Sequence, residues 1–153
     1  MTRHQEPPLH TREEFDFIAD APLDVAWPLF GAEGERAWVD DWRPVFVWPN
    51  VPADQHGMVF TVARGYKTAV WVNTCFDRAA NRIQYVYFLP DAFVTVITLA
   101  LRPTGRATHV QVVYERTALT PTANETVQTL AATDKVAGPH WCRQINQHLI
   151  HKP

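Results

Sequence analysis

Residues 57–120 decide the fold of this 153-residue chain and read GMVFTVARGYKTAVWVNTCFDRAANRIQYVYFLPDAFVTVITLALRPTGRATHVQVVYERTALT. Apolar residues alternate with polar ones over much of this stretch, which is typical of strands that bury one face. The predicted strands cover residues 57–64, 67–76, 82–89, 92–102 and 107–120. Because connections this short join antiparallel neighbours, the stretch is predicted to form an antiparallel meander.

The turn lengths predict which side chains share one face of this sheet. A two-residue turn at Gly65-Tyr66 places Phe60 opposite Trp71, and a three-residue turn at 90–92 places Tyr87 opposite Thr95. The resulting inner face is rich in aromatic residues and comprises Met58, Phe60, Val62, Trp71, Asn73, Cys75, Ile83, Tyr85, Tyr87, Leu89, Phe93, Thr95, Ile97, Leu99, Val110, Val112, Tyr114 and Arg116. The other face is more polar, although several valines and a phenylalanine interrupt it.

A long helix is predicted to follow the meander, beginning near Thr122. Residues 122–125, TANE, fit a capping box, in which two side chains satisfy orphan backbone donors at the helix start. One stripe at helical spacing contains Val127, Ala131, Asp134, Gly138, Trp141, Ile145 and Leu149. Gly138-Pro139 is expected to kink this helix or to divide it, since proline cannot donate to the preceding turn.

Asp134 lies at the centre of that apolar stripe. A carboxylate buried there needs hydrogen-bond donors or an upward pKa shift, because an unpaired buried charge is very costly. The inner-face tyrosines and the guanidinium of Arg116 are candidate donors. Alternatively, the break at Gly138-Pro139 turns the helix so that Asp134 reaches water.

Before the meander, the sequence predicts a loose tail over 1–12 and a first strand over 13–20. A helix should start after Pro22, and Pro28 should keep it short or kinked. A single domain is therefore expected over residues 13–153.

A second short helix is predicted over residues 33–42, where Trp38 and Trp42 would share one face. Asp40 and Asp41 are adjacent and would diverge on a helix, so a solvated turn explains them better than an acid/base pair. A brief strand is expected over 45–48.

Composition excludes several classes of protein. The net charge is −2 and no stripe of Lys or Arg is present, so nucleic acid is not an expected partner. The two cysteines, Cys75 and Cys142, form no metal or redox motif, which suggests reduced thiols in a cytoplasmic protein. Neither a signal peptide nor an apolar run long enough to span a membrane is recognisable. The oligomeric state cannot be deduced from these features.

The element order resembles that of the START-like superfamily, also called SRPBCC, which includes polyketide cyclase/dehydrase-like proteins. Local similarity lies in residues 17–27 (FIADAPLDVAW), 35–42 (ERAWVDDW), 117–125 (TALTPTANE) and 141–146 (WCRQIN). The resemblance implies an α+β helix-grip fold, a curved antiparallel sheet of six or seven strands around a long C-terminal helix, with two short helices after the first strand. It also implies a cavity for lipids, sterols, polyketides or other apolar ligands.

The predicted ligand-contacting residues are Trp38, Trp42, Phe60, Trp71, Tyr85, Tyr87, Thr95, Tyr114, Arg116, Asp134, Gly138 and Trp141. A mostly apolar interior with a few convergent polar groups is typical of a small-molecule site. No cofactor is expected. A metal is not expected either, because His148 and His151 lack a third ligand. His140 is expected at the cavity edge.

Three functions are compatible with these features. Binding or carriage of a small, largely apolar molecule is favoured, since no catalytic motif is recognisable. A polyketide-type cyclase or dehydratase would use the tyrosines and Asp134 to position the substrate or exchange protons, without a metal. A protein-interaction module would have a filled interior and an exposed apolar patch.

Overall fold

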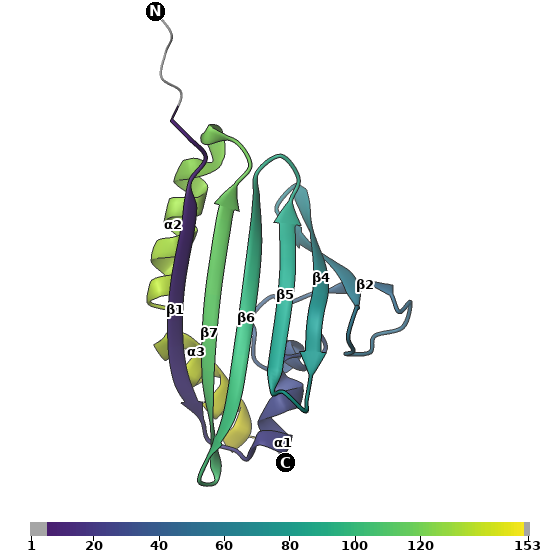
Figure 1. Ribbon diagram of the computed structural model, residues 1–153. Helices are drawn as coiled ribbons and strands as arrows, with labels where there is room; N and C mark the ends of the chain where they lie inside the picture. The colour runs from purple at the N-terminus through teal and green to yellow at the C-terminus, as the bar shows by residue number, and fades with distance from the viewer. Residues whose placement is uncertain (1–5, 152–153) are drawn as a thin grey trace, which may run out of the picture.

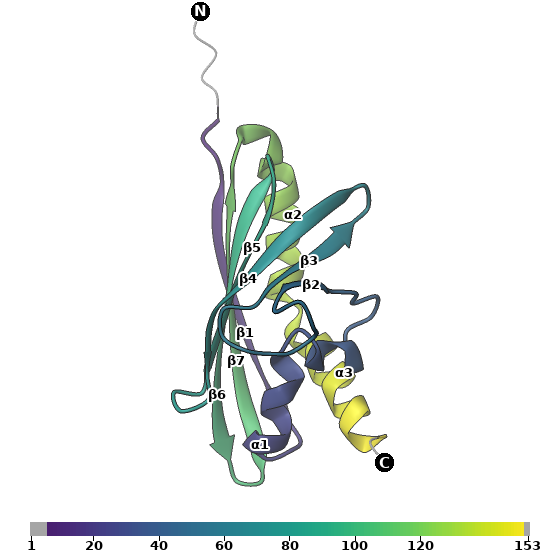
Figure 2. The same ribbon diagram turned by 90° about the vertical axis from the view of Figure 1, so that its right-hand side faces the viewer.

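Seven strands form one antiparallel sheet in the order β1-β7-β6-β5-β4-β3-β2, with the helices on one side of it (Figures 1 and 2). The structure is a computed structural model that describes residues 6–151. The strands are β1 (His10–Ala19), β2 (Val45–Trp48), β3 (Val59–Arg64), β4 (Lys67–Asp77), β5 (Arg82–Leu89), β6 (Phe93–Thr104) and β7 (Ala107–Ala118). The helices are α1 (Leu23–Ala26), η1 (Trp27–Phe30), η2 (Gly34–Ala37), η3 (Pro121–Ala123), α2 (Asn124–Lys135) and α3 (Gly138–Ile150). The predicted α+β helix-grip architecture is confirmed.

The strand registers agree with the predictions from turn length. Phe60 pairs with Trp71 across β3 and β4, and Tyr87 pairs with Thr95 across β5 and β6. One inner-face prediction is wrong, because a bulge in β4 between Asn73 and Cys75 shifts the register. Cys75 therefore lies opposite Gln84 on the outer face, since one extra residue reverses the alternation.

The first strand begins at His10, three residues before the predicted start. It continues this far because β7 is long enough to pair with it, with His10 opposite Thr117. Residues 1–5 of the predicted tail lie outside the described residues. The domain therefore includes residues 10–12.

The C-terminal helix is divided as predicted, since α2 ends at Lys135 and α3 begins at Gly138 with Pro139 in its first turn. The predicted capping box is wrong, because η3 precedes α2 and no side chain caps the helix start. Pro121 begins this extra turn. Asn124 instead accepts a hydrogen bond from the Leu9 backbone N–H at 2.7 Å, which ties the chain before β1 to α2.

The segment between β1 and β2 is more irregular than predicted. As expected, α1 is short, and Pro28 lies in the 3₁₀ turn η1 that follows it. The predicted helix over 33–42 is wrong in length, since only η2 is helical there. The side chain of Asp54 accepts hydrogen bonds from the backbone N–H groups of Glu33 at 2.9 Å and Gly34 at 3.2 Å. The two tryptophans that follow donate from their indole N–H groups to backbone carbonyls, Trp38 at 2.7 Å and Trp42 at 2.8 Å.

The core lies between the concave face of the sheet and the helices. Its fully buried side chains include Phe30, Phe60, Tyr87, Val112 and Ile145. Helices α2 and α3 both pack on β1. No helix within residues 6–151 is both long and apolar enough to cross a membrane.

Candidate functional site

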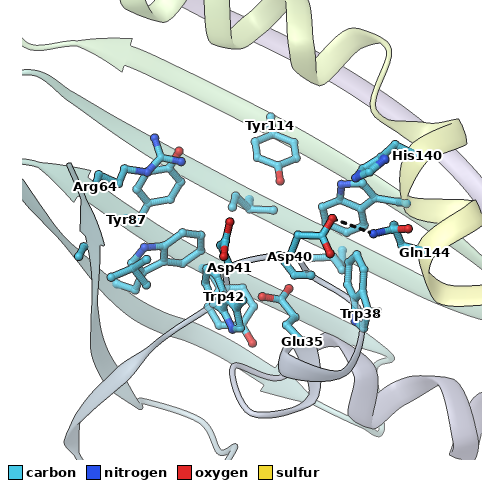
Figure 3. A pocket seen from close by; sticks show the side chains of 18 of the residues that line it. Glu35, Trp38, Asp40, Asp41, Trp42, Arg64, Tyr87, Tyr114, His140 and Gln144 are labelled. Atoms are coloured by element: carbon cyan, nitrogen blue, oxygen red, sulfur yellow. Dashed lines mark hydrogen bonds between the residues drawn. The ribbon is translucent and has the colours of Figure 1, made fainter. Parts of the chain in front are cut away.

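A cavity of about 420 Å³ opens between the concave face of the sheet, the segment after η1 and helix α3 (Figure 3). Its volume lies within the range of small-molecule sites. It is lined by Glu35, Trp38, Val39, Asp40, Asp41, Trp42, Val62, Ala63, Arg64, Trp71, Tyr85, Tyr87, Ile97, Leu99, Tyr114, Arg116, His140, Trp141 and Gln144.

Aromatic rings that support one another form most of the wall. Trp71 stacks on Tyr87 with ring centroids 4.2 Å apart, and the edge of Trp42 meets Trp71 at 5.4 Å. On the opposite side, Trp38 meets Trp141 of α3 edge to face at 5.0 Å. These contacts hold the rings in place without closing the space between them.

The three cavity tyrosines differ in their hydrogen bonds. The Tyr85 hydroxyl donates to the Phe30 carbonyl at 2.7 Å, and the Tyr87 hydroxyl accepts from Arg116 at 2.6 Å. The Tyr114 hydroxyl points into the cavity and makes no hydrogen bond within residues 6–151 (Figure 3). Burial raises the pKa of Tyr114 well above its usual range. It therefore remains a neutral group that can donate to a ligand.

Arg116 and Asp134 form a buried ion pair with two parallel bonds, so of the two alternatives for Asp134 the inward-facing one holds. Arg116 Nε lies 2.6 Å from Asp134 Oδ2, and Nη2 lies 2.7 Å from Oδ1. Burial opposes the charge on Arg116, but its hydrogen bonds and charge interaction with Asp134 prevail and raise the pKa of Arg116. Nη1 also donates to Thr95 Oγ1 at 3.0 Å. Both carboxylate oxygens of Asp134 are thus occupied, and only Arg116 reaches the cavity wall.

Glu35 is the acidic group inside the cavity that sequence reasoning missed. Its carboxyl projects from η2 into the space between Trp38 and Trp42 (Figure 3). Burial raises the pKa of Glu35 well above its ordinary value of 4.5, and the nearby charge of Asp54 raises it further. Its spacing of three residues before Trp38 is the signal that could have found it.

Charged and polar side chains surround the cavity mouth. Asp40 Oδ2 accepts a hydrogen bond from Gln144 Nε2 at 3.2 Å, which joins the loop to α3 (Figure 3). Asp41 is exposed beside it, and Arg64 lies over the Tyr87 ring at 5.4 Å from its centroid. The two aspartates are solvated, as predicted, yet both belong to the mouth. His140 also lies there, as expected.

Eight of the twelve predicted site residues line the cavity, namely Trp38, Trp42, Trp71, Tyr85, Tyr87, Tyr114, Arg116 and Trp141. The other four surround it without lining it. Phe60 stacks on Trp71, Thr95 and Asp134 bind Arg116, and Gly138 packs against Phe15. Turn parity also predicts Val62, Ile97 and Leu99 on the inner face, and all three line the cavity in addition to the predicted site residues. Residues 6–151 contain no cluster of three or more His, Cys, Asp or Glu that could hold a metal ion.

No protein-family model matches this sequence, and no curated protein matches it. Norcoclaurine synthase from Thalictrum flavum has a similar structure, with a TM-score of 0.69 and 11% identity over 99% of this chain and 96% of that one. An uncharacterised protein from Rhizobium leguminosarum has a TM-score of 0.66 and 13% identity over 95% and 98% of the two chains. A protein from Mesorhizobium loti has a TM-score of 0.65 and 14% identity over 94% and 99%. The chain therefore has the same helix-grip fold as these proteins.

Proposed function

We propose that this protein binds one small, largely apolar aromatic molecule in the cavity between its sheet and helix α3. The observation that carries the proposal is a space of about 420 Å³ kept open among four tryptophans and three tyrosines. Protein interiors normally close such gaps, because an unfilled space forfeits dispersion contacts. A ligand that occupied this space would recover them.

The shape and chemistry of the wall favour a planar ligand. A ring that stacks or packs edge-on against an aromatic side chain gains about 0.5–1.5 kcal/mol beyond the area it buries. The Glu35 carboxyl and the Tyr114 hydroxyl would then fix its orientation, since both point into the cavity (Figure 3). A few polar groups in an aromatic cavity give orientation more than affinity.

Turnover of a polyketide-like substrate is a second candidate, supported by Glu35. A carboxyl with a raised pKa in a cavity is suited to proton transfer. Asp134 is a poorer choice for this role, because Arg116 binds both of its oxygens. The interaction-module alternative predicted a filled interior, and the open cavity argues against it.

A pocket-filling substitution tests the proposed binding. Val62 lines the cavity from β3, whereas the side chain of the preceding residue, Thr61, points to the other face. Val62→Trp should lower affinity for the neutral dye N-phenyl-1-naphthylamine about tenfold or more. A tenfold loss corresponds to about 1.4 kcal/mol of binding free energy. Thr61→Trp adds a larger side chain to the same strand outside the cavity and should bind the dye like the wild type. Dye emission titrations measure both, and equal binding by all three proteins would refute the proposal.

A further inference from the structure

We propose that the cavity selects ligands that carry a basic nitrogen on an aromatic body, and that the Glu35 carboxylate is the group that pairs with this nitrogen. The inference rests on the proposed function, because it names the class of ligand for the same cavity. It concerns a residue for which the fold assigns no structural partner.

The Glu35 carboxyl has no hydrogen bond or ion pair within residues 6–151, although it is only partly exposed and faces the cavity (Figure 3). The neighbouring Arg36 does not neutralise it, since Arg36 Nε binds Glu33 at 2.7 Å and Nη2 binds the Pro44 carbonyl at 2.8 Å. A carboxylate that is partly withdrawn from water and has no partner is less stable than one in bulk water. A ligand that brings a cationic donor would remove this cost.

Neither arginine of the cavity wall pairs with the Glu35 carboxylate. Arg116 is neutralised by Asp134 through two hydrogen bonds. Arg64 is exposed at the mouth, over the ring of Tyr87. Asp40 and Asp41 add negative charge at the mouth. The two aspartates at the mouth outnumber the one unneutralised arginine, so the balance of charge there favours a cationic ligand over an anionic one.

The walls beside Glu35 offer a second attraction for the same ligand. Trp38 and Trp42 extend from the same segment as Glu35 into the cavity (Figure 3). The face of an indole ring attracts an ammonium group, and the attraction is stronger where water is excluded. An aromatic amine would gain both this interaction and a charge-assisted hydrogen bond to the carboxylate. A neutral molecule of the same shape would gain neither in full.

Proton release should accompany the binding of such a cation. Burial, and then the charge of Asp54, raise the pKa of Glu35, so its carboxyl stays protonated to a higher pH than in the unfolded chain. The titratable and charged groups around it are Asp54 before β3, Asp40 and Asp41 on its own loop, Arg64 on β3, Tyr85 on β5, Tyr114 and Arg116 on β7, and His140 on α3. An ammonium group beside Glu35 would lower its pKa again and expel the proton.

Isothermal titration calorimetry with matched probes tests the inference. 2-Phenylethylamine, 2-phenylethanol and phenylacetate share an aromatic body and differ in charge. The wild type should bind the amine about tenfold or more tightly than the alcohol, and should bind phenylacetate most weakly. Glu35→Gln should lose most of the preference for the amine, keeping only the part due to the indole rings and the charges at the mouth, and should keep wild-type affinity for the alcohol. Glu33→Gln changes a carboxyl of the same segment outside the cavity and should behave like the wild type.

The same titrations in two buffers of different ionisation enthalpy count the protons released. The amine should release protons from the wild type at a pH where Glu35 is partly protonated, whereas the alcohol should not, and Glu35→Gln should release none with either probe. Equal affinities of the wild type for amine and alcohol would overturn the inference but leave the proposed function standing. If none of the three probes bound to a protein that binds the neutral dye, the inference would likewise be overturned and the proposed function would stand. A preference for the amine that was undiminished in Glu35→Gln would also overturn it, while failure of the dye itself would remove the proposed function.

Discussion

Two acidic residues, Asp134 and Glu35, lie in the interior, and their surroundings give them different roles. Asp134 is held by Arg116 through two short hydrogen bonds, and Arg116 in turn binds Tyr87 and Thr95. Glu35 faces the cavity with no such partner within residues 6–151. We therefore assign Asp134 to the stability of the cavity wall and Glu35 to the ligand.

Replacement of Asp134 should unfold the protein more readily. Asp134→Ala leaves the Arg116 guanidinium buried without its counter-ion, which typically costs about 3–5 kcal/mol. The free energy of unfolding, measured by urea denaturation, should fall by this amount. Asp24→Ala removes an exposed partner of Arg78 and should cost about 0–1 kcal/mol. A loss below about 1 kcal/mol in Asp134→Ala would contradict the structural role assigned to this ion pair.

Residue-scale features were only partly predictable from the sequence. Helical spacing located Asp134 on the inner stripe and turn parity brought Arg116 to the same interior, because both arguments depend on regular geometry. Glu35 escaped because it lies on a 3₁₀ turn with no regular period. Its spacing from Trp38 was the one local signal, whereas the hydrogen bonds of Asp54 that fix the turn could not be predicted from the neighbouring residues.

At the scale of elements, η2 is placed by close packing on the preceding turn η1. A Cβ atom added at Gly34 would lie 1.7 Å from the carbonyl oxygen of Pro28, which is backbone and cannot rotate away. Glycine is therefore required for this approach. Because Gly34 directly precedes Glu35, the packing of this turn determines where the Glu35 carboxyl lies in the cavity.

Gly34→Ala should displace η2 and destabilise the protein by about 1–3 kcal/mol, because overpacking forces backbone shifts. The variant should also lose any preference of the cavity for the amine probe. Gly138→Ala is the matched control, since its Cβ would meet no atom closer than 3.4 Å. Thermal and urea unfolding should show a clear loss for Gly34→Ala and a change within about 1 kcal/mol for Gly138→Ala. Similar losses in both variants would show that the contact with Pro28 is unimportant.

The elements themselves were predictable in proportion to their regularity. Alternation and short turns located β4, β5 and β6 within two residues, and Gly138-Pro139 located the break between α2 and α3. The bulge in β4 was not predictable, because one extra residue leaves the apolar pattern on either side unchanged. The capping box failed since Pro121 began an additional turn before it.

For the whole molecule, the raised pKa of Glu35 links stability to pH. Between its ordinary pKa of 4.5 and its higher value in the fold, the folded state binds more protons at Glu35 than the unfolded state does. This contribution to stability is therefore complete at low pH and is lost as the pH rises through that interval. The pKa of Asp54 is also raised, chiefly by burial, so a variant is needed to isolate Glu35.

Glu35→Gln should become more stable relative to the wild type as the pH rises above 4.5. Urea unfolding at a series of pH values measures this difference, and Glu33→Gln serves as the reference. A constant difference in unfolding free energy between wild type and Glu35→Gln across the series would show that Glu35 titrates normally.

The irregular loop after η1 has an evolutionary consequence. The strands supply the support of the cavity through long-range pairing and the buried ion pair, whereas Glu35, Trp38, Asp40, Asp41 and Trp42 all lie within eight consecutive positions. Asp54, Gly34 and the contact of Asp40 with α3 hold the backbone of this loop, and Trp38 anchors it in the core. Mutations in one short window can therefore exchange the chemistry of the cavity while the inherited scaffold stays intact. Substitutions at its polar positions, Glu35, Asp40 and Asp41, would change the charge of the cavity without removing a side chain from the buried core.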